Sequence, residues 1–108
     1  MALRKAHNAQ ALQAVSERVQ EAAEVLKALS SDTRLKIMCA LSAGELPVNK
    51  LAEFTGQSQS AVSQHLTKLR AAALVDSRRD GQTIYYRCRK GIAQDIIDTL
   101  CKYYGPRG

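Results

Sequence analysis

The stretch SQSAVSQHLTKLR, residues 58–70, decides how this 108-residue chain folds. Its apolar residues recur at the spacing of one side of a helix. They are Ala61, Val62, Leu66 and Leu69. Ser58 stands where a hydroxyl caps a first helical turn. The remaining side is polar, and residues 55–75 contain no Asp or Glu, although exposed helices ordinarily mix both signs of charge. The stretch therefore predicts a helix with one buried side and one side suited to a polyanion.

The flanking segments extend this helix into a larger motif. Residues 48–54 predict a short helix that ends at Thr55-Gly56, and two short helices around a Gly-containing turn form a helix-turn-helix, here 48–72. The pattern then changes from helical to extended, and residues 74–78 and 83–87 are strand-like. The Asp80-Gly81 pair between them indicates a hairpin, because Gly accepts the positive φ of the turn. We expect this hairpin, or wing, at 74–88.

Three further helices are expected around this motif, at 10–29, 33–43 and 92–104. The predicted fold class is mainly α with a small β-hairpin, a winged helix-turn-helix in the order α-α-α-α-β-β-α. Residues 10–105 form a single domain in this prediction, and residues 1–9 form a disordered N-terminus.

The helices at 10–29 and 92–104 carry apolar stripes larger than a monomer of this size needs. Helices at the two chain ends can pack against a second copy across a two-fold axis. We therefore predict that both helices build a homodimer. If the helix that begins at Ser58 reads DNA, and is here called the reading helix, a dimer would place its two copies about 34 Å apart on a pseudo-palindromic DNA site.

The charge of the chain is unevenly spread. The formal net charge is +6, and residues 57–91 hold seven Lys and Arg against two Asp. Such a concentration is expected of a surface that binds double-stranded DNA, and the alternative is a solvated basic face. No segment resembles a signal peptide or a membrane span, so we expect a cytoplasmic protein with no membrane partner.

Reading the major groove requires polar side chains on the first two turns of the reading helix. The candidates for base contact are Gln59, Ser60, Ser63 and Gln64, beside the capping Ser58. His65 could reach a base or a phosphate, or serve only as a local hydrogen-bonding residue. Lys68 is a candidate for the phosphate backbone.

The wing supplies Arg78, Arg79 and Gln82 as further DNA candidates. A narrow hairpin with arginines can follow the phosphates or enter the minor groove. Alternatively, these arginines only keep an exposed hairpin soluble and block edge pairing.

Enzymatic activity is not expected. The sequence contains no nucleophile elbow, Gly-rich phosphate loop or paired carboxylates. The three cysteines lack the spacing of a disulfide framework or a zinc finger. The alternative to a DNA-binding regulator is a protein-interaction module whose basic face docks an acidic partner.

Three segments together resemble the ArsR/SmtB family of bacterial repressors. They are LSSDTRLKIM at 29–38, SQSAVSQHLTKLR at 58–70 and DGQTIYY at 80–86. The resemblance covers about residues 20–104. It implies a winged-helix homodimer with repressor activity, in which the reading helix faces the operator and the first and last helices form the interface.

Many members of that family sense metals, and this chain lacks their ligands. The thiol motif before the reading helix falls on residues 46–50, which contain no Cys. The last helix offers only Asp95 and Asp98 where the family's site needs imidazoles. We therefore expect no metal and no cofactor.

A branch similar to the biofilm-growth repressor and the haemolysin regulator senses oxidants or reactive sulfur through two thiols. Cys39 matches the first position, whereas the second falls on Gly105, one turn beyond Cys101. This resemblance implies a Cys39–Cys101 switch, and the alternative is that both are small hydrophobic residues. The Thr83-Ile84-Tyr85-Tyr86 segment and the Tyr104-Gly105 ending resemble a further branch, that of the rhizobial nodulation repressors, which implies a repressor without a small-molecule sensor.

Overall fold

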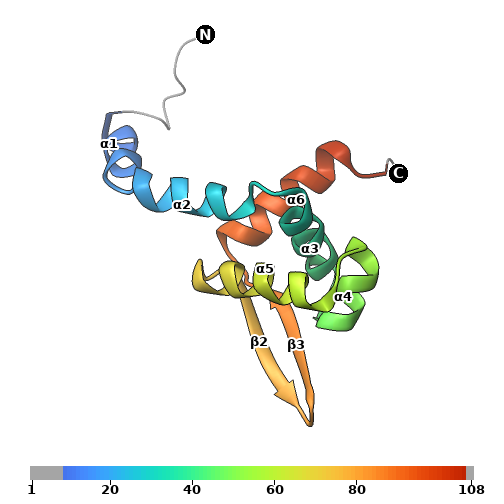
Figure 1. Ribbon diagram of the computed structural model, residues 1–108. Coiled ribbons are helices and arrows are strands. Elements are labelled where there is room, and N and C mark those ends of the chain that lie inside the picture. Colours follow the sequence, from blue (N-terminus) through green and yellow to red (C-terminus); the bar gives the residue numbers. More distant parts are fainter. Residues whose placement is uncertain (1–8, 107–108) are drawn as a thin grey trace.

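The computed structural model describes residues 9–106, which fold as six helices and a small antiparallel sheet (Figure 1). The helices are α1 (Ala9–Glu17), α2 (Val19–Leu29), α3 (Asp32–Ser42), α4 (Val48–Thr55), α5 (Gln59–Ala71) and α6 (Ile92–Tyr104). The strands are β1 (Leu46–Pro47), β2 (Val75–Asp80) and β3 (Thr83–Cys88). This arrangement confirms the predicted winged helix-turn-helix.

The core forms where α3, α4, α5 and α6 meet the base of the sheet. Its largest fully buried side chains are Ile37, Met38, Leu51, Val62, Leu66, Leu69, Leu74, Val75 and Ile97. Burying each of the larger ones is worth about 1.5–3 kcal/mol relative to leaving it exposed. The apolar side of α5 is therefore fixed inward, and its polar side must face out.

Turns with defined backbone geometry connect α4, α5 and β2. Gly56 ends α4 in the left-handed region at φ 72°. At the other end of α5, the N–H of Ala73 donates to Arg70 O and that of Leu74 donates to Leu69 O, both at 2.9 Å. These bonds form a Schellman C-terminus. Ala73 occupies its left-handed position at φ 60°, where Gly is the usual residue.

The sheet is wider than predicted, because β1 adds a third strand in the order β1-β3-β2. Leu46 pairs with Tyr86, and Pro47 pairs with Tyr85. This strand was missed because it has only two residues, one of them a proline, and so shows no strand pattern. We call β2, β3 and their turn the wing. β2 runs to Asp80, further than expected, whereas β3 begins at Thr83 as expected, so the turn is only Gly81-Gln82.

The single helix predicted at 10–29 is two helices in the structure. Arg18 departs from helical geometry at φ −120° and ψ 16°, which separates α1 from α2. No residue of α1 is buried, so α1 is not anchored in the core of residues 9–106. Ala9 already belongs to α1, although the disordered segment was expected to run to residue 9; residues 1–8 lie outside the described residues.

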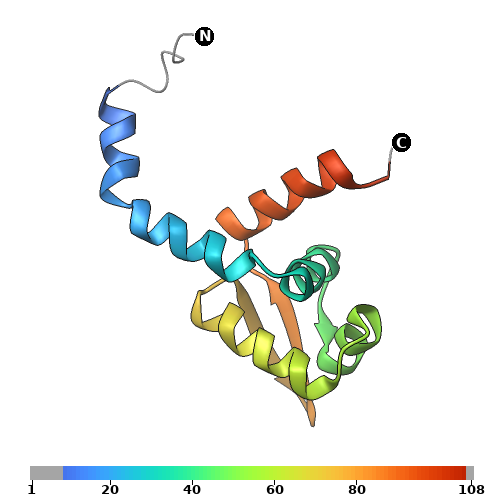
Figure 2. The ribbon, with the colours of Figure 1, turned by 45° about the horizontal axis from the view of Figure 1, so that its top comes forward.

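The helices α1, α2 and α6, which we call the outer helices, lie at a different end of the molecule from the wing. Figures 1 and 2 show α1 and the end of α6 projecting from the body on the side away from the wing tip. The helix-turn-helix lies between these two ends. This separation leaves the outer helices free to pack elsewhere while α5 and the wing face another surface.

Candidate nucleic-acid interface

The N-terminus of α5 is capped and open to solvent. Ser58 Oγ accepts a hydrogen bond from the Ala61 N–H at 3.0 Å, as expected for a helix N-cap. The remaining N–H groups of the first turn carry the positive end of the helix dipole, which favours a nearby phosphate. This end of the helix can therefore approach DNA without electrostatic cost.

The predicted base-contacting residues share the exposed side of α5. Gln59, Ser60, Ser63 and Gln64 are all exposed on its first two turns. Thr67 is also exposed, one turn beyond Ser63, and its hydroxyl donates to Ser63 O at 2.9 Å. Thr67 was not among the predicted site residues, although its position three residues after Gln64 could have indicated it.

His65 differs from these neighbours because it is half-buried. Its Nδ1 atom is buried and has no hydrogen-bond partner among the described residues. Desolvation, then the charges of Arg34 and Lys68, lower the pKa of His65 below its ordinary value. The neutral imidazole is therefore favoured in the free protein, and His65 lies beside the basic residues rather than on the open polar side.

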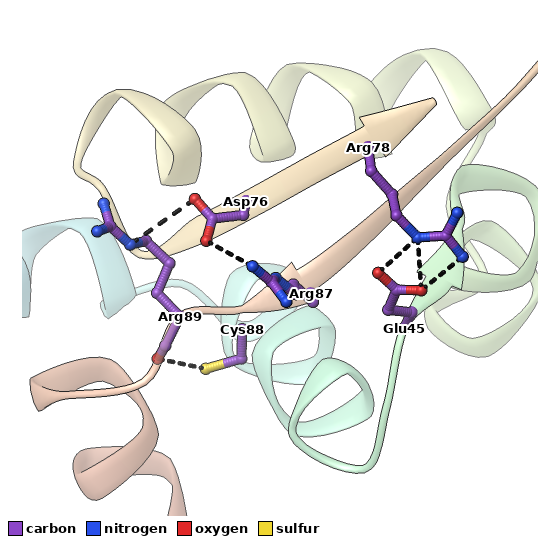
Figure 3. A network of polar contacts seen from close by, with 6 residues as sticks. All are labelled: Glu45, Asp76, Arg78, Arg87, Cys88 and Arg89. Carbon is purple, nitrogen blue, oxygen red and sulfur yellow. Dashed lines mark hydrogen bonds and ion pairs between the residues drawn. The ribbon is translucent and has the colours of Figure 1, made fainter. Parts of the chain in front are cut away.

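The three predicted wing residues have different surroundings. Arg79 and Gln82 are exposed near the turn. Arg78 instead forms a two-pronged ion pair with Glu45: its Nη2 lies 2.8 Å from Glu45 Oε1, and its Nε lies 3.0 Å from each carboxylate oxygen (Figure 3). This pairing lowers the pKa of Glu45, chiefly through the hydrogen bond, and raises that of Arg78. Arg78 is thus occupied by a protein carboxylate.

Ion pairs also occupy other cations of the basic segment. Asp76 lies 3.7 Å from Arg87 Nη2 through one oxygen and 3.7 Å from Arg89 Nε through the other (Figure 3). Within residues 57–91, the cations that have no ion pair are Lys68, Arg70, Arg79 and Lys90. The charge available to a polyanion is therefore concentrated on α5, near the tip of the wing and just after β3.

The structure brings the two candidate sensor thiols to one apolar cavity. Cys39 on α3 and Cys101 on α6 both line this cavity of about 390 Å³, together with Gly105. Cys39 is half-buried and Cys101 is exposed. Burial, and to a smaller extent the neighbouring Cys101 thiol, raises the pKa of Cys39. Cys88 is buried elsewhere, with its thiol 3.5 Å from Arg89 O.

Residues 9–106, which the structure describes, contain no group of three or more His, Cys, Asp or Glu side chains that could hold a metal ion. Asp95 and Asp98 are both exposed on α6, and Asp98 accepts a hydrogen bond from Gln94. None of the helices described is long and apolar enough to cross a membrane.

A capped helix with an acid-free exposed side, next to a two-stranded basic wing, defines a winged-helix DNA-binding regulator. A family model described as "Bacterial regulatory protein, arsR family" matches residues 31–77. The chain is 45% identical over 89 residues to the nodulation protein NolR of Rhizobium meliloti, covering 82% of this chain and 73% of NolR. The chain belongs to the ArsR family. It is a transcriptional regulator and not an enzyme.

Further relatives agree with this assignment. The transcriptional activator HlyU of Vibrio cholerae is 37% identical over 93 residues, which cover 86% of each chain. The solved structure of its reduced form matches with a TM-score of 0.82 at 35% identity, covering 87% of this chain and 99% of that one. NolR from Sinorhizobium fredii matches with a TM-score of 0.76 at 38% identity, covering 99% of both chains.

One structural neighbour bears on assembly. The homodimeric winged helix-turn-helix DNA-binding domain Mb0332 from Mycobacterium bovis matches with a TM-score of 0.74 at 27% identity. The match covers 95% of this chain and 89% of that domain. The outer helices α1, α2 and α6 are thus set in a fold that a neighbour uses as a homodimer.

Proposed function

We propose that this regulator represses transcription by binding a pseudo-palindromic operator as a homodimer and thereby occluding promoter DNA. The observation that carries the proposal is the outward, acid-free side of α5, whose opposite side is locked in the core. A protein that acts on bacterial promoters works in the cytoplasm. No small-molecule sensor is needed for this activity.

Contacts with DNA divide by chemistry. Gln59 and Gln64 can each form two hydrogen bonds to adenine, and Ser60 and Ser63 can bond to any base edge. Ser58 and the first N–H groups of α5 suit a phosphate. The cations of the interface position the protein on the backbone without reading sequence. They are Lys68 on α5 and Arg79 on the wing; the uncharged Gln82 in the wing turn is a further candidate for contact with the backbone.

The dimer is supported by apolar side chains that the single chain leaves exposed. On the outer helices these are Leu12, Val15, Val19, Leu26, Ile92, Tyr103 and Tyr104. Val15, Val25 and Ile92 also line a groove between the N-terminal helices and the start of α6. A second copy of this chain offers the same apolar surfaces, so a two-fold axis can cover both sets at once. We assign residues 10–29 and 92–104 to this interface.

Binding selection from a random duplex library tests the proposal. A dimeric reader should enrich an inverted repeat with half-sites about one helical turn apart, and binding should weaken steeply with salt. A module that docks only an acidic protein would enrich no DNA sequence. Enrichment of a single half-site by a monomer would support sequence-specific binding and contradict the dimer.

A second candidate function is release from DNA by oxidation of Cys39 and Cys101. Their position on one cavity is the observation that favours it. Hydrogen peroxide would transfer one oxygen to the exposed Cys101 thiol, which gives a sulfenic acid, and release the other oxygen as water. Attack by the Cys39 sulfur on the sulfenic acid would then release a second water and form the disulfide. Linking α3 to α6 would then shift α5 relative to the dimer helices.

Mass spectrometry and DNA binding after peroxide treatment test this function together. We expect a Cys39–Cys101 link that abolishes operator binding in the wild type and in Cys88→Ser, but not in Cys39→Ser. Unchanged binding by the fully oxidised protein would instead identify a repressor without a thiol sensor.

A further inference from the structure

Arg78 crosses the whole width of the sheet. It stands on edge strand β2, its guanidinium lies over the Tyr85 ring of β3 at 4.8 Å, and it ends on Glu45, which directly precedes β1. Glu45 and Arg78 are 33 residues apart in the chain. One side chain therefore connects the far edge of the wing to the segment that leads into the helix-turn-helix.

Arg78 stands at the level where the sheet narrows from three strands to two. Pro47 pairs with Tyr85, and Tyr85 pairs with Arg78, which makes one row across all three strands. Beyond this row only the Arg79–Ile84 and Asp80–Thr83 pairs continue to the turn. A two-stranded ribbon twists and bends more freely than a three-stranded sheet. The row at Arg78 is thus the hinge about which the tip can swing.

From this geometry we propose that Glu45 is a positioning residue: by holding Arg78, it fixes the direction in which the wing tip presents Arg79 to DNA. The inference rests on the proposed DNA contact of the wing. It also reassigns Arg78, which the sequence placed among the DNA-contacting residues, to holding the wing.

A direct contact between Arg78 and DNA predicts the opposite effect of Glu45→Gln on DNA affinity. If Arg78 binds a phosphate directly, Glu45 competes with the DNA, and Glu45→Gln should tighten binding because it frees the guanidinium and removes a negative charge. If Glu45 positions the wing, the same change should weaken binding, although it makes the protein more basic. Electrostatics alone thus cannot imitate the expected result.

The matched control is Glu53→Gln. Glu53 is an exposed acid of α4 paired with Lys50 at 3.8 Å, and it has no ion pair with the wing. Both variants change the net charge by the same amount. We expect Glu45→Gln to bind operator about 3- to 10-fold more weakly than Glu53→Gln, the range of one well-formed surface pair with a cation–π contact. Equal or tighter binding by Glu45→Gln would overturn the proposal.

A coupling measurement separates positioning from loss of stability. Arg79→Ala is made in the wild type and in Glu45→Gln, at a temperature where thermal unfolding shows all four proteins folded. Because Glu45 acts through the direction of the tip, Arg79 should matter less once Glu45 is replaced. The loss of operator-binding free energy caused by Arg79→Ala should be less than about half as large in the Glu45→Gln background as in the wild type. An undiminished loss would contradict the proposal.

The free protein provides a readout that does not depend on DNA. Backbone amide relaxation should show faster local motion at Gly81 and Gln82 in Glu45→Gln than in Glu53→Gln. Should Arg79→Ala leave wild-type binding unchanged, the wing contact is wrong, and this relaxation difference alone then decides whether Glu45 holds the wing. Identical tip motion in the two variants would refute that role.

Discussion

Replacing Leu26 by Glu should dissociate the dimer. Leu26 lies on α2, and 60% of it is exposed in the single chain. Complete burial of a leucine is worth about 1.5–3 kcal/mol, so covering the exposed part contributes about 1–2 kcal/mol per protomer. A two-fold axis uses the residue twice, which gives about 2–4 kcal/mol, or roughly 30- to 1000-fold in the dimer Kd. The buried carboxylate would add to this loss.

Sedimentation equilibrium measures the dimer Kd directly. Phe54→Glu is the matched control, because Phe54 is 59% exposed but lies on α4, outside the proposed interface. We expect Phe54→Glu to dimerise as the wild type does, while Leu26→Glu sediments as a folded monomer. Equal dimerisation by the wild type and Leu26→Glu would refute the assignment of the outer helices to the interface.

Three other expectations follow from the site and its supports. Arg79→Ala should reduce the slope of log affinity against log salt by about one, since one phosphate contact is lost; an unchanged slope would remove Arg79 from the interface. His65 has a lowered pKa, so the unfolded state binds its proton first and the free energy of unfolding should fall as pH drops below about 6.5; in denaturant titrations His65→Asn should lack this component. Ala73→Gly should stabilise the protein by about 0.5–1 kcal/mol by relieving a left-handed backbone at φ 60°, and a lower melting temperature would contradict the strain.

Local patterns in the sequence were sufficient to predict the reading helix. The buried side of α5 follows from the spacing of Val62, Leu66 and Leu69, and the cap follows from Ser58. The hairpin follows from Gly81, whose φ of 65° the turn requires. Each of these features depends on residues within a few positions of one another, which is the range that sequence patterns describe.

Features that depend on distant residues could not be predicted in this way. The pairing of Arg78 with Glu45 joins positions 33 residues apart, and no local sequence pattern around either residue predicts it. The lowered pKa of His65 depends in part on the charge of Arg34, which α3 supplies from 31 positions earlier in the chain. The break at Arg18 has no proline or glycine to signal it, and it follows a helix that has no buried residue.

The central claim, that α5 reads DNA sequence, is tested most directly by the affinity of Gln64→Ala for a selected operator and for random duplex at the same salt. The account predicts a loss of about 1–3 kcal/mol on the operator and almost none on random DNA, because a base contact carries specificity and a phosphate contact does not. Operator binding as tight as that of the wild type, or an equal loss on both DNAs, would contradict it.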